Sequence, residues 1–142
     1  MIVIYRPTDG DAEQYDATTL KCSEASLVSR ATDKPWPVVR AGLLLGDVDA
    51  MRGIAWVLRR REDPDLQFDD FDPGTDELTA AFAPQEVADY CERIAAAESS
   101  SDPDEIEAAY RELADSAADP EAAAVYIAES RGRLPEGVTN GG

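Results

Sequence analysis

The chain has 142 residues, of which 30 are Asp or Glu and 13 are Lys or Arg, and its formal net charge is −17. This length suits one ordinary domain with a tail or two very small domains, and the acidic balance disfavours unaided binding to nucleic-acid phosphates. Histidine is absent, which excludes His-based triads, His general bases and His-rich metal sites. No apolar run approaches the ~20 residues of a membrane span, and the N-terminus lacks a signal-peptide pattern. We therefore expect a soluble, intracellular protein that is not an enzyme and carries no cofactor.

The charge is divided unevenly along the chain. Residues 1–61 hold 9 basic and 8 acidic residues, a net of +1, whereas residues 62–142 hold 4 basic and 22 acidic residues, a net of −18. This asymmetry favours two modules with different roles.

The first 46 residues predict a short strand followed by two helices. The β-rich run at 2–5 predicts a strand, and an extended piece around 15–20 is expected to pair with it. A helix is expected from Ser23, its N-cap, to a break at 33–37. A second helix is expected over 37–45, ending at a glycine.

The strongest helical pattern covers residues 48–61, with Asp47 as its N-cap. On a helical wheel one wide arc is apolar, which predicts that this helix forms the centre of the core; its members are Val48, Met51, Ile54, Ala55, Val57 and Leu58. Gly53 within the helix indicates a close helix crossing. Trp56 lies outside the arc, with Arg52 and Arg60 one turn away on either side.

The second half alternates turn signals with Ala/Glu-rich helical patterns. Residues 62–74 contain two prolines and a glycine, so we expect an extended segment whose aromatic residues pack back onto the core. Helices are expected at about 84–98, 103–117 and 120–131, and the last two begin after Asp-Pro pairs that match the N-cap and N1 signature. Residues 134–142 are expected to be a flexible tail.

Three groups of residues are of types that can bind metals, react or bind nucleic acid, but their positions in the sequence do not favour such roles. The acidic run 69–77 resembles a calcium loop, but Thr75 and Ala81 stand where an EF-hand starting at Asp70 needs Gly and Glu, so we expect a solvated loop and no metal site. Cys22 and Cys91 are expected to be small buried hydrophobic residues, with a redox or intermolecular bridge as the alternative. The basic run 59–61 ends a helix, where cations complement the helix dipole.

Trp56 has two interpretations. Either another helix covers it, or it anchors a protein–protein contact, because Trp and Arg are enriched at such contacts. The candidate partner-binding residues, with the other aromatic side chains that such a contact would use, are Trp36, Arg52, Trp56, Arg60, Phe68 and Phe71.

Residues 20–72 carry a resemblance to a known family. The runs that carry it are EASLV at 24–28, TDKPW at 32–36, GDVDAMR at 46–52, IAWVLRR at 54–60 and DLQFDDFD at 65–72. This succession resembles the tail assembly chaperones of long-tailed bacteriophages that infect high-GC Gram-positive bacteria. It covers about a third of the chain and contains no catalytic signature.

The resemblance implies a non-enzymatic function in the host cell cytoplasm. Such chaperones coat the tape measure protein, recruit the major tail (tube) protein around it and are absent from the mature virion. The family often makes a longer second product by programmed ribosomal frameshifting. A holder of this kind needs an aromatic or apolar docking face and a high net charge to keep the complex soluble. Self-association is left open, and no contact with nucleic acid or membrane is expected.

Two alternatives come from other classes. An acidic protein can act as a DNA mimic that inhibits a DNA-binding host enzyme, and a structural tail or head–tail component would remain in the virion. For the fold we expect a mainly α protein with a small N-terminal β element. It comprises a chaperone-like domain at 1–75, an acidic helical region at 76–133 and the tail at 134–142.

Overall fold

The computed structural model describes residues 1–132, which form two compact units. Unit 1 comprises Met1–Ala81 and unit 2 begins at Phe82. Within the described residues there are six α-helices and one small three-stranded antiparallel sheet, so the expected fold class, mainly α with a small N-terminal β element, is confirmed. The expected tail at 134–142 lies outside the described residues.

The sheet of unit 1 has the order β2-β1-β3. Strand β1 (Ile2–Tyr5) is central and pairs antiparallel with β2 (Glu13–Asp16) and β3 (Leu78–Ala81), so that Val3 stands between Tyr15 and Ala80. The expected partner strand at 15–20 is therefore displaced. Pairing stops at Asp16, whose carboxylate accepts from the Thr18 amide and starts a 3₁₀ turn, η1 (Ala17–Thr19).

Strand β3 was not predicted, because Leu-Thr-Ala-Ala is not a β-rich run. Its pairing with β1 extends unit 1 to Ala81, six residues past the expected boundary at 75. The acidic segment 62–77 thus belongs to unit 1. By sequence, unit 1 has 9 basic and 16 acidic residues, a net of −7, and unit 2 has 4 and 14, a net of −10.

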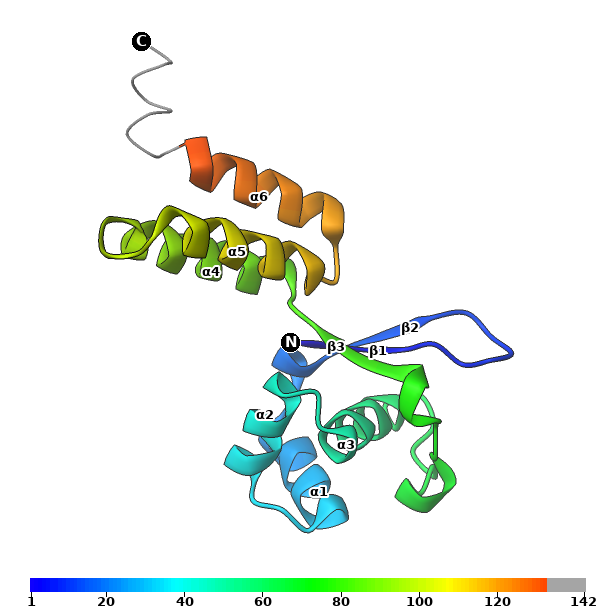
Figure 1. Ribbon diagram of the computed structural model, residues 1–142. Helices are drawn as coiled ribbons and strands as arrows, with labels where there is room; N and C mark the ends of the chain where they lie inside the picture. The colour runs from blue at the N-terminus through cyan, green and yellow to red at the C-terminus, as the bar shows by residue number, and fades with distance from the viewer. Residues whose placement is uncertain (133–142) are drawn as a thin grey trace. The chain divides into compact units, whose positions relative to one another are not determined.

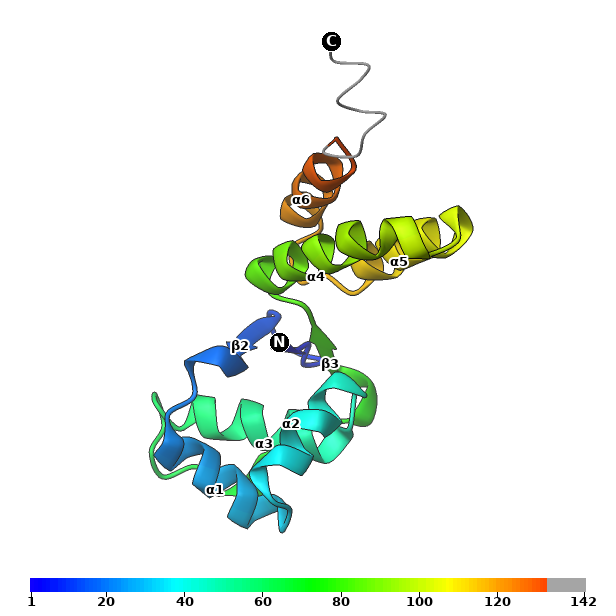
Figure 2. The same cartoon turned by 90° about the vertical axis from the view of Figure 1, so that its left-hand side faces the viewer.

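Three helices lie on one side of this sheet (Figures 1 and 2). They are α1 (Cys22–Thr32), α2 (Trp36–Leu44) and α3 (Val48–Arg59). Helix α1 begins one residue before the expected N-cap Ser23, because the carboxylate of Glu24 accepts from the amide of Lys21, 2.9 Å away. Asp47 caps α3 as expected, accepting from the Ala50 amide at 3.1 Å.

Helix α3 is the centre of the core of unit 1, as predicted. Every residue from Ala50 to Leu58 except Arg52 is buried. A Cβ atom built on Gly53 would lie 2.8 Å from Val28 Cγ1, which confirms the close crossing of α1 and α3 at this glycine. The other members of the predicted apolar arc are buried, but Val48 at the N-terminal end of the helix is 39% exposed.

Unit 2 is a three-helix arrangement in which each helix packs against the other two. Its helices are α4 (Pro84–Ala97), α5 (Pro103–Asp115) and α6 (Pro120–Gly132), close to the expected ranges, and the turn η4 (Glu98–Ser100) joins α4 to α5. Apolar residues of α4 and α5 meet α6 in a separate core, formed by Val87, Cys91, Tyr110, Leu113 and Ala123.

Candidate functional site

Five of the six candidate partner-binding residues contact one another inside unit 1. After α3 the chain turns back along that helix, and we call residues 61–74 the strap; it includes the 3₁₀ turn η2 (Phe68–Asp70). Phe71 is buried in the core, and Leu66 and Phe68 pack against it. The expectation that the aromatic residues of this segment pack onto the core is confirmed.

Arg52 holds the far end of the strap. Its Nε donates to the Phe71 carbonyl at 2.7 Å, and one terminal nitrogen donates to the Phe68 carbonyl at 2.9 Å. The guanidinium also lies 4.0 Å from the centre of the Phe68 ring. An irregular segment has carbonyl groups without ladder partners, and the several N–H donors of one arginine supply those partners.

Trp56 is covered by the near end of the strap. Its exposed fraction is 6%, its Nε1–H donates to the Leu66 carbonyl at 3.0 Å, and its ring meets Phe68 edge-on. Arg60 lies over the same indole ring and donates to the Pro64 carbonyl. The element that covers Trp56 is thus the strap rather than another helix, and a helical wheel of α3 alone contains no signal for it.

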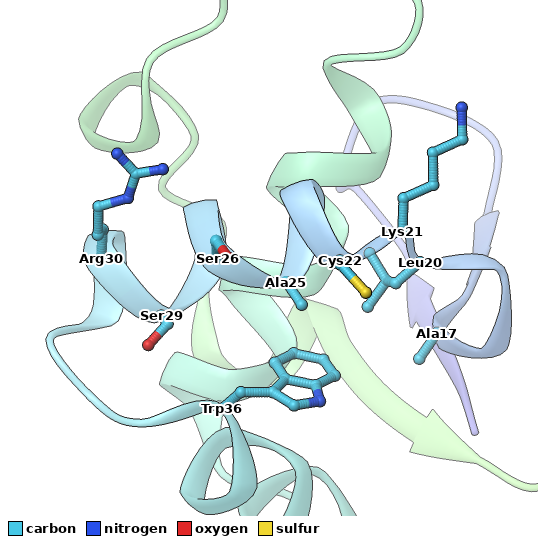
Figure 3. A pocket seen from close by; sticks show the side chains of 9 residues that line it. All are labelled: Ala17, Leu20, Lys21, Cys22, Ala25, Ser26, Ser29, Arg30 and Trp36. Atoms are coloured by element: carbon cyan, nitrogen blue, oxygen red, sulfur yellow. The ribbon is translucent and has the colours of Figure 1, made fainter.

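Trp36, the sixth residue, lines an open groove of about 580 Å³ on unit 1. Figure 3 shows its indole ring across from the side chains of Cys22, Ala25 and Ser29 on α1. The remaining lining comes from the η1 region and α1, namely Ala17, Leu20, Lys21, Ser26 and Arg30. We call this the Trp36 groove. Cys22 is exposed here, contrary to expectation, because it begins α1 on the helix's outer side, whereas Cys91 is buried as expected.

The charges around the groove are unusual for so acidic a chain. Lys21 and Arg30 lie near the two ends of α1, and Figure 3 shows their charged groups pointing away from Trp36. Among the residues that the structure describes, no lining side chain is acidic. The nearby carboxylate of Glu24 is engaged by Arg61 through two hydrogen bonds of 2.8 and 2.9 Å, which lower the pKa of Glu24 to about 2.

A second surface of unit 1 is the solvent side of α2, a feature that the sequence analysis missed. Pro37, Val38, Ala41, Leu44 and Leu45 are all exposed, and we call them the α2 outer face. Leu45 is 87% exposed, Leu44 57% and Val38 51%. Opposite them, Val39 and Leu43 are buried in the core.

Helix α2 is therefore apolar on both sides, with Arg40 as its only charged residue. A helix that is apolar all round is normally buried on all sides, so the outer face is a candidate for contact with another chain. The signal was present in the sequence, because residues 36–45 contain only one polar side chain.

Unit 2 uses several of its carboxylates for local structure. Asp102 and Asp119 accept from backbone amides at the starts of α5 and α6, and Glu86 accepts from the Ala83 amide. Glu107 pairs with Arg131, and the hydrogen bond from Arg131 lowers the pKa of Glu107. Buried Ser130 shares a hydrogen bond of 2.8 Å with Tyr110 and donates to the Cys91 carbonyl.

The side chains and helices of residues 1–132 bear on metal binding and on membrane crossing. No group of three or more Cys, Asp or Glu side chains in this part of the chain is arranged to hold a metal ion. None of the helices there combines the length and the apolar character that crossing a bilayer requires.

Comparisons with protein-family models, with curated protein sequences and with solved structures find no match to this chain.

Proposed function

We propose that this protein is a phage tail assembly chaperone that acts in the host cell cytoplasm. It binds the tape measure protein, recruits the major tail protein and leaves before the virion is complete. The observation that carries the proposal is the α2 outer face, an exposed apolar surface on the same part of the chain that resembles this family. The hypothesis requires such a surface to cover apolar segments of the client.

The size of the α2 outer face suits a reversible contact. Full burial of one aliphatic side chain contributes about 1.5–3 kcal/mol. Val38, Leu44 and Leu45 are already partly covered, so the three together contribute roughly 3–6 kcal/mol, before the cost of association is subtracted. A single copy would bind weakly, and many copies along a long client would shield it while each can still leave.

The net charge supports the second requirement of a holder. Both units are acidic, at −7 and −10. A complex coated with such a protein repels other coated complexes, which opposes aggregation before the tube covers the client.

Trp56 is not accessible to a client. Because its ring is buried and its N–H is satisfied by the strap, Trp56→Ala is expected to lower the stability of unit 1 by about 3 kcal/mol or more, the usual cost of removing a buried Trp. Any loss of client binding in that variant would follow from unfolding.

The test is capture of the tape measure protein by co-expression and affinity purification. The double variant Leu44→Ser, Leu45→Ser removes the two most exposed leucines without changing the charge, and it is expected to lower capture at least about tenfold. The control Arg40→Ser also places a serine on the exposed side of α2, but it removes the charged residue of that helix and no apolar side chain. It is expected to retain capture. Circular dichroism must show that all these proteins remain folded.

Three outcomes would contradict the proposal. Undiminished capture by the double-serine variant would exclude the α2 outer face as the client site. Stoichiometric presence of the protein in purified virions would indicate a structural tail component. Competition with duplex DNA for a DNA-binding host enzyme would favour the DNA-mimic alternative.

A further inference from the structure

We draw no further inference here: the strongest candidate, the Trp36 groove between α1 and the start of α2, is an open surface of unit 1, and nothing in the structure shows what covers it.

Discussion

Individual arginines in α3 and just after it stabilise unit 1 by two different kinds of contact. Arg52 and Arg60 donate to backbone carbonyls of the strap, whereas Arg61 binds a carboxylate on α1. The first kind closes the irregular segment over Trp56. The second ties the end of α3 to the start of α1, next to the Trp36 groove.

The Glu24–Arg61 pair makes the stability of unit 1 depend on pH. Hydrogen bonding to Arg61 lowers the pKa of Glu24 from 4.5 to about 2. Above pH 4.5 the pair contributes fully to the free energy of unfolding. As the pH falls from 4.5 towards 2, the unfolded chain takes up the proton first, so the contribution is progressively lost.

Glu24→Gln tests this dependence while keeping an oxygen that can accept from the Lys21 amide. We expect the variant to be less stable than the wild type by about 1 kcal/mol at pH 7, because the pair is partly exposed to solvent. The difference should shrink below pH 4.5, as measured by urea unfolding followed by tryptophan fluorescence. Glu62→Gln, an exposed residue of the same unit, is the control. An equal difference at pH 7 and pH 3 would show that the charge of Glu24 is not responsible.

At the scale of elements, the crossing of α1 and α3 depends on the absence of a side chain at Gly53. The nearest atoms to a Cβ there are Val28 Cγ1 at 2.8 Å and Thr32 Cγ2 at 3.1 Å, both on α1. These contacts are tighter than van der Waals packing permits, so an added methyl group must push the helices apart.

Gly53→Ala is therefore expected to destabilise the protein by about 1–3 kcal/mol, although alanine is the better helix former by about 1 kcal/mol. In a Val28→Ala background the closest clashing atom is gone, and the same substitution should cost at least about 0.5 kcal/mol less. Urea unfolding of the four proteins measures this coupling. Equal costs in both backgrounds would mean that the helices do not meet at this point.

The exposed sides of α2 and α6 differ in the side chains that they present to solvent. Helix α2 is apolar on two sides, so it cannot bury all its apolar surface within unit 1. The exposed side of α6 carries carboxylates on either side of its apolar residues, whereas α2 has a single arginine. The α2 outer face is therefore the surface proposed to contact the client.

At the scale of the whole molecule, each unit has its own core. The buried residues of unit 1 centre on α3, and those of unit 2 centre on the contact of α4, α5 and α6. Both tryptophans belong to unit 1. Tryptophan fluorescence therefore reports the unfolding of unit 1, and far-ultraviolet circular dichroism reports both units.

Ser130→Ala is expected to separate the two signals. It leaves the buried hydroxyl of Tyr110 without the serine partner that stands 2.8 Å away in the wild type, which should destabilise unit 2 by about 1–3 kcal/mol. Part of the circular dichroism transition should move to lower urea while the fluorescence transition stays in place. Val28→Ala in unit 1 is the reciprocal control and should move the fluorescence transition. Equal movement of both signals by Ser130→Ala would mean that the units unfold as one.

The sequence predicted the helices well because their signals are local. Asp47 before an amphipathic run, and Asp-Pro twice before Ala-rich runs, specify helix starts without reference to the rest of the chain. Gly53 indicated a close crossing for the same reason, since a glycine inside a strong helix is costly unless its lack of a side chain is needed.

Contacts between distant segments could not be predicted in this way. Residues 78–81 form a strand only because β1 offers them its free edge, and Trp56 is buried only because the strap returns along α3. The Trp36 groove requires η1, α1 and the start of α2 to meet, and its two cations are nine residues apart in the chain. Composition and helical periodicity thus determined which segments are helical and how acidic the chain is, because these depend on neighbouring residues. Three-dimensional packing decided which of the aromatic residues are covered and which surfaces remain for other chains, because burial depends on residues that are far apart in the sequence.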